Sequence, residues 1–155
     1  MKHIVLAVYL FLAVAASAQG HRTFVKSKLA AERHLPFSSA VKVGDTLYVA
    51  GTTADPDRLT AGLAPEQEAV DLLDQVKQNI EKVGMTMDDV VSVQVFCTDL
   101  SLYQTFNGVY IKYFHGDFPA RSFLGVNKLL FGARFEVNAV AVARAKKQFG
   151  TRSSG

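Results

Sequence analysis

Residues 66–100 read EQEAVDLLDQVKQNIEKVGMTMDDVVSVQVFCTDL, and this stretch holds a helical pattern followed by a strand pattern. From residue 66 to residue 83 the apolar side chains recur every three or four positions, which predicts an amphipathic helix that Gly84 ends. From residue 90 to residue 100 apolar side chains alternate with others, which predicts a strand. A helix followed directly by a strand indicates a domain in which helices pack on a sheet.

The segments on either side of this stretch predict five more strands and one more helix. The strands are expected at residues 22–26, 37–43, 46–51, 121–127 and 135–143, and the second helix at 102–114. Gly44 and Asp45 form a hairpin turn between the second and third strands. Residues 55–65 read as a loop. The order β-β-β-α-β-α-β-β predicts an α+β fold of two layers, with two helices on one face of a mixed six-stranded sheet.

The second face of this sheet has no predicted helix to cover it. The last strand nevertheless carries apolar residues on both sides, because Val140 and Val142 alternate with Ala139 and Ala141. Self-association of the chain is the economical way to cover such a face.

The first eighteen residues differ in character from the rest of the chain. A basic start at Lys2 and His3 precedes an apolar run over residues 4–16, and small residues end at Ala18. This layout predicts a secretory signal peptide, since the run is shorter than the roughly 20 residues of a membrane anchor. We therefore expect a protein exported to the periplasm or secreted, and not membrane-bound after cleavage. The expected parts are a signal peptide at 1–18, a single domain at 19–145 and a flexible polar tail at 146–155.

Charge and ligand residues argue against several classes of function. The formal net charge of +3 falls to +2 when Lys2 leaves with the signal, which is no footprint for nucleic acid. Cys97 is the only cysteine; it alternates with core valines, so we expect a buried apolar role and not a nucleophile. The histidines of the mature chain lack the spacing of a zinc site, and we expect no metal and no cofactor.

Arg121 lies in the stretch FPARSF (118–123) among apolar and small neighbours. A guanidinium keeps its charge at ordinary pH, so it requires an anion there. One reading is a structural ion pair with Glu136, which begins the last strand, or two surface charges at strand ends. The other is a site in which Arg121 clamps an incoming carboxylate while Glu136 handles a proton or positions a water. Spacing does not decide between them; Arg134, in the loop before, reads as a solvated charge.

Six segments within about residues 25–143 resemble, in order and spacing, the Rid proteins, a family also called YjgF/YER057c/UK114 or L-PSP endoribonuclease. They are LPFSSAVKVGDTLYVAGTTA, NIEKVG, VVSVQVFCTDL, YQTFNGVYIKYF, FPARSFLGV and FEVNAVAVA. The resemblance implies a chorismate-mutase-like fold assembled as a homotrimer, with ligand clefts at the subunit boundaries. It also implies hydrolysis of reactive 2-imino acids to 2-oxo acids and ammonia, without a cofactor.

The resemblance further implies roles for individual residues. Arg121 matches the arginine that binds the substrate carboxylate, Glu136 the acid that orients the attacking water, and Asn107 an asparagine near the cleft. Three expected substrate-binding positions depart from the deaminating members, which have Tyr, Ser and Cys there: Phe37, Ala50 and Phe123. These changes make the pocket more apolar, so the substrate does not follow from the resemblance. A non-catalytic trimer that binds small carboxylates and an endoribonuclease are the alternative functions.

Overall fold

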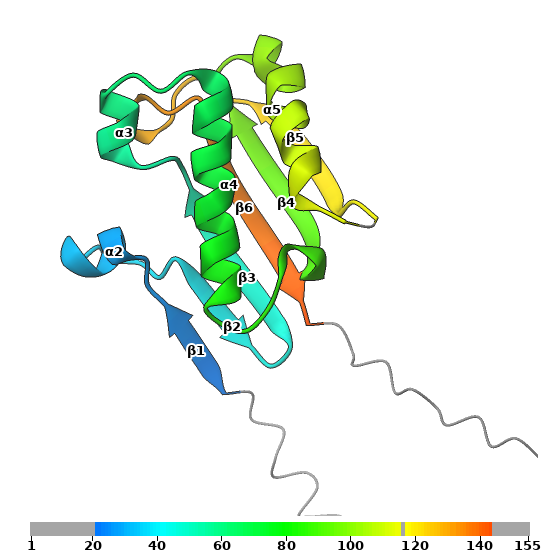
Figure 1. Cartoon of the computed structure of the whole chain (residues 1–155). Coiled ribbons are helices and arrows are strands. Elements are labelled where there is room, and N and C mark those ends of the chain that lie inside the picture. Colours follow the sequence, from blue (N-terminus) through cyan, green and yellow to red (C-terminus); the bar gives the residue numbers. More distant parts are fainter. Residues whose placement is uncertain (1–20, 116, 144–155) are drawn as a thin grey trace, which may run out of the picture.

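The structure is a computed structural model, and it describes residues 21–115 and 117–143 (Figure 1). The expected signal peptide at 1–18 and the expected tail at 146–155 lie outside the described residues. None of the helices in the described ranges combines the length and the apolar character needed to cross a bilayer.

A mixed six-stranded sheet, counted over the described residues, forms one layer of the domain (Figure 1). Its strands are β1 (Arg22–Val25), β2 (Ala40–Val43), β3 (Thr46–Thr52), β4 (Val90–Cys97), β5 (Ala120–Gly125) and β6 (Phe135–Val142). Their spatial order is β1-β2-β3-β6-β4-β5; β4 and β5 run parallel, and every other neighbouring pair is antiparallel. The α+β prediction is confirmed, with strand ends shifted by one to three residues.

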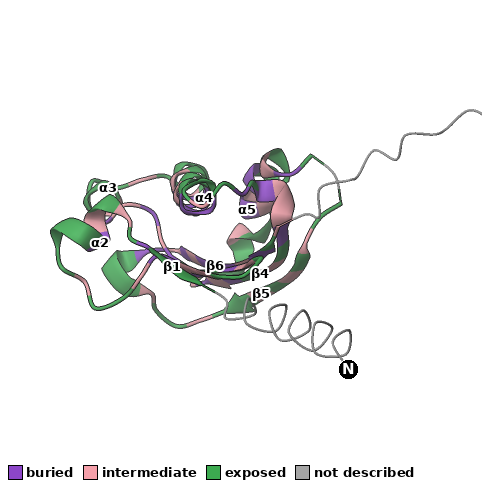
Figure 2. Cartoon of the chain, turned by 90° about the horizontal axis from the view of Figure 1, so that it is seen from below, coloured by how far each residue is buried: buried purple, intermediate pink, exposed green. Residues whose placement is uncertain are grey.

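Two helices, α4 (Pro65–Glu81) and α5 (Tyr103–Tyr110), lie across one face of the sheet (Figure 2). The apolar stripe of α4 is buried and consists of Ala69, Leu72, Leu73, Val76 and Ile80. The odd-numbered residues of β6 are buried on the same side of the sheet. The core forms where the apolar stripe of α4 packs against the odd-numbered residues of β6. This agrees with the helical period of α4 and the two-residue period of β6. The expected helix at 102–114 is α5 followed by one 3-10 turn, Ile111–Tyr113.

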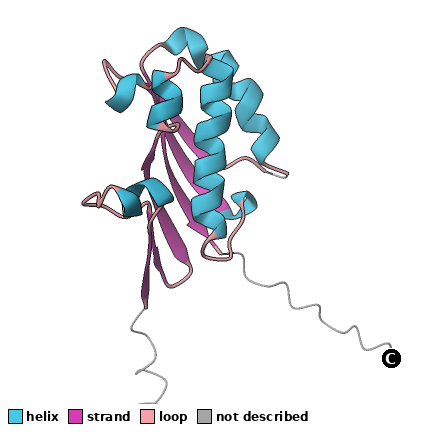
Figure 3. Ribbon diagram, turned by 60° about the vertical axis from the view of Figure 1, so that its left-hand side comes forward, coloured by secondary structure: helices cyan, strands magenta, loops and turns pink. Residues whose placement is uncertain are grey.

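Two short helices were not expected from the sequence: α2 (Lys28–Glu32) and α3 (Pro56–Thr60), both visible in Figure 3. The loop prediction for 55–65 is therefore wrong over α3. One helical turn is too short to produce a periodic apolar pattern, and the caps specify it instead. Asp55 accepts hydrogen bonds from the backbone N–H groups of the first turn of α3, and Ser27 caps α2 in the same way.

An ion pair between a buried carboxylate and a partly exposed guanidinium joins α4 to the start of β6. Glu68 on α4 is fully buried, and its Oε1 accepts from the backbone N–H groups of Arg134 (2.5 Å) and Phe135 (3.0 Å). The Arg134 guanidinium donates to Glu68 Oε2 at 2.7 Å. The expectation that Arg134 is a solvated charge is therefore wrong. The buried carboxylate of Glu68 on α4 requires a positively charged partner, and the sequence around Arg134 does not indicate that Arg134 is this partner.

The face of the sheet opposite α4 and α5 carries a row of apolar side chains. Strand register aligns Phe24, Val41, Tyr48 and Val140 across β1, β2, β3 and β6. Phe24 is 62% exposed and Tyr48 is 54% exposed. In the described part of the chain this face of the sheet therefore exposes apolar side chains to solvent, as expected for a sheet with helices on one face only.

Candidate functional site

Arg121 lies on β5, the edge strand, and its side chain faces the helix layer. Its register partner on β4 is Val93, which is buried in the core on that side of the sheet. On α5 the side chains of Tyr103, Asn107 and Tyr110 follow at intervals of four and three residues, so they share one helix face. The side chain of Arg121 contacts this face of α5.

The guanidinium of Arg121 is held by neutral groups. Its Nη2 donates to Asn107 Oδ1 at 2.8 Å and to the Tyr103 hydroxyl oxygen at 3.3 Å. Its Cζ lies 4.6 Å from the centre of the Tyr110 ring, within range of a cation–π interaction. Among the residues that the structure describes, no carboxylate pairs with Arg121, and its Nε and Nη1 have no hydrogen-bond partner. The donors that form the planar fork are thus available to an anion.

The two tyrosines of this stripe sit in different environments. The hydrogen bond with Asn107, followed by the positive charge of Arg121, lowers the pKa of Tyr103. Burial raises the pKa of Tyr110 to about 12 against the smaller opposing effect of Arg121. The Tyr110 hydroxyl is buried and has no hydrogen-bond partner among the residues that the structure describes. Sequence reasoning named Asn107 but missed both tyrosines, although their spacing from it on one helix face was a usable signal.

Phe123 forms the apolar floor beside Arg121. It lies two residues further along β5 on the same face, and its ring meets those of Tyr103 at 5.0 Å and Phe106 at 5.6 Å, edge to face. The rings of Tyr103, Tyr110 and Phe123 thus lie around Arg121, and Asn107 and the Tyr103 hydroxyl are its polar contacts. An aromatic, partly dry surrounding strengthens the attraction of the guanidinium for an incoming carboxylate.

Glu136 lies on the opposite face of the sheet. Its register partner on β4 is Phe96, three residues from the partner of Arg121, and alternation along a strand sends the two positions to opposite sides. Within the described ranges Glu136 forms no ion pair, and the suggested pair with Arg121 does not exist inside one chain. The two expected catalytic residues are therefore not brought together by a single copy of the fold.

The carboxylate of Glu136 rests directly on Gly51, at an irregularity in the β3–β6 pairing. A Cβ atom at residue 51 would collide with Glu136 Oε1 and would lie 3.3 Å from Asn138 Oδ1. Gly51 is therefore needed because a carboxylate approaches its backbone closely. Sequence reasoning missed this role, since a glycine inside a strand pattern does not reveal what comes close to it.

A cavity of about 510 Å³ opens beside Glu136. Its lining includes two more of the expected substrate-binding residues, Phe37 and Ala50. The six expected site residues thus divide into two groups: Arg121, Asn107 and Phe123 on the helix side, and Glu136, Phe37 and Ala50 around the cavity. Cavities of this size are typical of small-molecule sites.

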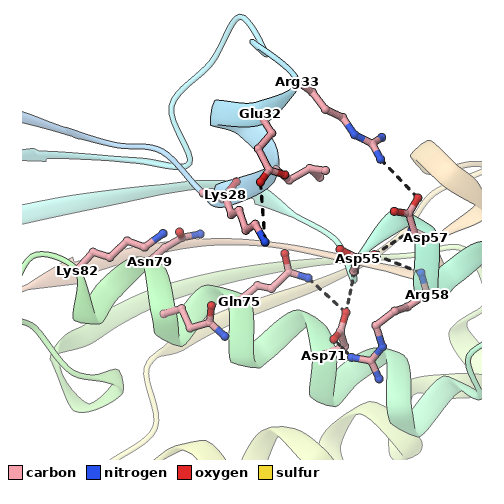
Figure 4. A pocket seen from close by; sticks show the side chains of 13 residues that line it. Lys28, Glu32, Arg33, Asp55, Asp57, Arg58, Asp71, Gln75, Asn79 and Lys82 are labelled. Atoms are coloured by element: carbon pink, nitrogen blue, oxygen red, sulfur yellow. Dashed lines mark hydrogen bonds and ion pairs between the residues drawn. The ribbon is translucent and has the colours of Figure 1, made fainter.

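A second cavity, of about 560 Å³, lies beneath α2 and α3 and is polar (Figure 4). Six of its eight charged side chains pair with one another. The ion pairs are Arg58–Asp71, Arg33–Asp57 and Lys28–Glu32. Asp71 also accepts from the backbone N–H of Asp55 at 2.7 Å, which fixes α3 to α4. These mutual contacts give the polar cavity a structural role.

The described residues offer neither a reactive thiol nor a cluster of metal ligands. Cys97 is buried, and its thiol donates to the Asp99 carbonyl at 3.0 Å. Burial raises the pKa of Cys97, which disfavours the thiolate that a nucleophile requires. The predicted buried role of Cys97 is confirmed. No three histidine, cysteine, aspartate or glutamate side chains in residues 21–115 and 117–143 gather as metal ligands.

Comparison with known proteins identifies the class to which this fold and site belong. Residues 27–143 match the family described as Endoribonuclease L-PSP. A member of the YjgF/YER057c/UK114 family from Mycobacterium tuberculosis superposes with a TM-score of 0.70 at 28% identity, over 79% of this chain and all of that one. Escherichia coli TdcF, solved with bound serine, superposes with a TM-score of 0.64 at 25% identity, over 70% of this chain and 89% of that one.

Relatives with named activities are more similar in sequence. The 2-iminobutanoate/2-iminopropanoate deaminase of Homo sapiens is 34% identical over 110 residues, which cover 69% of this chain and 80% of the human protein. The enzyme of the same name from Dermatophagoides farinae is 31% identical over 123 residues, 78% of this chain and 96% of the mite protein. The chain therefore belongs to the L-PSP endoribonuclease family, also known as YjgF/YER057c/UK114 or Rid.

Proposed function

We propose that this protein is a cofactor-free deaminase that hydrolyses 2-imino acids to 2-oxo acids and ammonia. The observation that carries the proposal is the guanidinium of Arg121, which lies in an aromatic pocket with no carboxylate partner in the described chain. A planar fork with free donors suits the carboxylate that every 2-imino acid carries. Two relatives named as deaminases and one solved with an amino acid, serine, support this choice of substrate class.

In this proposal the catalytic site forms between two copies of the chain. Arg121 and Glu136 lie on opposite faces of one sheet, so one copy supplies the arginine and a neighbour supplies the glutamate. The apolar row on the uncovered face, with Phe24 and Tyr48 exposed, supports association of copies through that face. The homotrimer implied by the family resemblance meets this requirement with three equivalent sites.

The chemistry requires positioning and one proton relay. With the substrate carboxylate on Arg121, the Glu136 carboxylate accepts a proton from a water as the water oxygen attacks the electrophilic imine carbon. A C–O bond forms, and the electron pair of the C=N bond moves to nitrogen. Glu136 then returns its proton to the nitrogen, which gives a carbinolamine. In a second transfer Glu136 takes the proton of the new hydroxyl group and passes it to the nitrogen, the C–N bond breaks, and ammonia leaves as the C=O bond of the 2-oxo acid forms. One water is consumed for each ammonia released.

The environments of Phe37, Ala50 and Phe123 bear on the choice of substrate. Phe37 and Ala50 line the cavity beside Glu136, and Phe123 borders Arg121. None of the three side chains offers a hydrogen bond to a ligand. Substrate orientation therefore depends on the charge of Arg121 and on apolar contacts more than on hydroxyl donors.

Ammonia release from freshly generated 2-imino acids tests the proposed reaction. We expect wild-type protein to exceed the buffer rate, and Arg121→Lys to lower kcat/KM by about 10- to 100-fold, because an ammonium cannot form the two parallel hydrogen bonds. Arg22→Lys, an exposed arginine on β1, is the matched control and should behave as wild type. No rate above buffer with any imino acid would refute the deaminase. Binding of 2-oxo acids without turnover would favour the carboxylate-binding alternative, and RNA cleavage that Arg121→Lys abolishes would favour the endoribonuclease.

We also propose that the protein is exported, on the basis of its first eighteen residues. Cleavage after Ala18 would leave Gln19 as the amino terminus. Mass spectrometry of the protein from its native host checks this directly, because an intact terminus at Met1 or Lys2 contradicts cleavage.

A further inference from the structure

We propose that the cavity beside Glu136 receives the side chain of the substrate and is built for a large apolar one, aromatic or branched aliphatic. This inference rests on the proposed function, since it assumes that the reacting carbon lies at Glu136. It goes further by predicting discrimination among 2-imino acids. Small side chains would leave the cavity partly empty, and large apolar side chains would fill it.

Apolar side chains provide most of the surface of the cavity, although the polar side chains of Arg33, Gln75 and Asn79 also line it. Besides Glu136, the apolar residues around it are Leu29, Leu35, Phe37, Ala50, Ala54, Pro56, Leu130 and Phe131. These residues come from α2, the loop before β2, β3, the segment that leads into α3 with the first residue of that helix, and the turn before β6, so elements far apart in the sequence line the cavity. A volume of about 510 Å³ leaves room for a side chain much larger than a methyl or ethyl group.

The hydroxyl groups of the lining are already engaged with the protein. Ser39 Oγ accepts from the backbone N–H of Ser27 at 2.9 Å, and Thr52 Oγ1 donates to the Ala50 carbonyl at 2.9 Å. Thr53 Oγ1 donates to the Ala54 carbonyl at 3.0 Å. A polar substrate side chain would thus lose its hydration in this cavity for few new hydrogen bonds, whereas an apolar one gains by leaving water.

Asn79 on α4 marks where the apolar part ends. It borders both this cavity and the polar cavity of Figure 4, is 4% exposed, and has no hydrogen-bond partner in the part of the chain described. Its amide therefore has free hydrogen-bonding capacity toward a polar group of a ligand. The lining of the cavity thus includes both the carboxylate of Glu136 and the amide of Asn79.

Two large apolar side chains also stand at the rim. Leu130 is 70% exposed and Phe131 is 55% exposed. The backbone of Phe131 has φ +60° and ψ +15°, a left-handed conformation that bulky residues rarely adopt. Strain of this kind persists where the surrounding structure requires a particular side-chain position. Here it holds an aromatic ring at the edge of the cavity, where an apolar ligand would contact it.

Binding of stable 2-oxo acids tests the inference without depending on turnover. With pyruvate and phenylpyruvate as probes in isothermal titration calorimetry, we expect phenylpyruvate to bind at least about tenfold more tightly. If the protein is a deaminase, kcat/KM should favour the imine of phenylalanine over that of alanine by a similar ratio. Leu29→Trp fills the cavity and should bring either ratio close to one.

Phe131→Asn provides a second variant that should fold normally, because asparagine tolerates the left-handed conformation. It removes the ring at the rim and should reduce the preference for phenylpyruvate several-fold. Ile111→Trp, an exposed apolar residue that lines neither cavity, is the control and should leave the ratio unchanged.

The outcomes separate the two proposals. A clear preference for phenylpyruvate, lost in Leu29→Trp and reduced in Phe131→Asn, supports the cavity assignment even if no imino acid is hydrolysed, and in that case only the deaminase proposal fails. Hydrolysis that is equally fast for small and large substrates overturns the cavity assignment and leaves the deaminase intact. Failure to bind either oxo acid, or a preference that survives both variants, also overturns the cavity assignment.

Discussion

Arg121 and Glu136 point to opposite faces of one sheet, although they begin consecutive strands of the sequence. β4 lies between β5 and β6, and its residues Val93 and Phe96 are the respective register partners. Three residues separate these partners, and an odd separation along a strand reverses the side. A ligand that contacts both charged groups must therefore lie between two copies of the chain.

This geometry predicts recovery of activity when two inactive variants are mixed. Arg121→Ala and Glu136→Gln should each lower kcat/KM by at least about 100-fold, because one lacks the carboxylate clamp and the other lacks the base. In mixed oligomers some sites combine the intact arginine of one copy with the intact glutamate of another. With equal amounts and random assembly, about a quarter of the sites are intact, and ammonia release should recover to about that fraction of wild type.

The mixing control is the double variant with Arg121→Ala and Glu136→Gln in one chain, mixed with wild type. Co-expression or joint refolding ensures that subunits exchange. If the separate variants give no recovery while native gels show mixed oligomers, the site does not combine these residues from different copies.

Gly51 and Glu136 provide a second test, because the glutamate rests on the glycine backbone. Gly51→Ala should displace the carboxylate and lower kcat by about tenfold or more while the fold is retained. Gly108→Ala is the matched control: residue 108 is exposed on α5, has open space for a Cβ, and should gain about 0.5–1 kcal/mol of stability from helix propensity. Normal kcat in Gly51→Ala would contradict a catalytic role for the position of Glu136.

The layers of the fold could be predicted because periodicity reports which face of an element is buried. The apolar stripe of α4 and the alternation of β4 gave the correct elements, with boundaries a few residues too long. The short helices α2 and α3 were missed, since caps and not periodicity specify them. Periodicity also does not predict which side chain pairs with a buried carboxylate. Arg134 was therefore expected to be a surface charge, whereas in the structure it binds Glu68.

The site was predicted in its residue types but not in its arrangement. The sequence indicated which residues of β5 share a face with Arg121 and which residues of β6 share a face with Glu136. Whether these two faces lie on the same side of the sheet depends on the register in which β5 and β6 each pair with β4. Tertiary pairing sets that register, and a shift of one residue would have placed both side chains on the same face of the sheet. The tyrosines at 103 and 110 share a helix face with Asn107, which the sequence alone indicates, but only the structure shows that Arg121 on β5 contacts that face.

The buried carboxylate of Glu68, which accepts from Arg134 and from two backbone N–H groups, predicts a large effect on stability. Glu68→Ala should lower the free energy of unfolding by about 3–5 kcal/mol, because it removes the acceptor for Arg134 and for two backbone N–H groups. Glu66→Ala on the same helix removes an exposed pair with Lys112 and should change stability by less than about 1 kcal/mol. Denaturant titration of both variants measures the contrast, and equal effects would refute a structural role for Glu68.

Tyr110 predicts a loss of stability at alkaline pH. Its pKa is raised to about 12 in the folded protein, whereas an unfolded tyrosine titrates near 10. Between these values the unfolded chain has released the proton that the folded chain still holds. The contribution of Tyr110 is therefore fully present below about pH 10 and is lost as pH rises toward 12. Tyr110→Phe should weaken this alkaline loss in denaturant titrations across that window.

At pH 7 the same variant should be as stable as wild type or more stable by up to about 1 kcal/mol, because the buried hydroxyl has no partner to lose. Tyr103→Phe provides the comparison of opposite sign. The pKa of Tyr103 is lowered by Asn107 and Arg121, so ionisation of Tyr103 favours the folded state as pH rises, and its removal should steepen the alkaline loss. Parallel pH profiles for the two variants would contradict the difference between the buried environment of Tyr110 and the hydrogen-bonded environment of Tyr103.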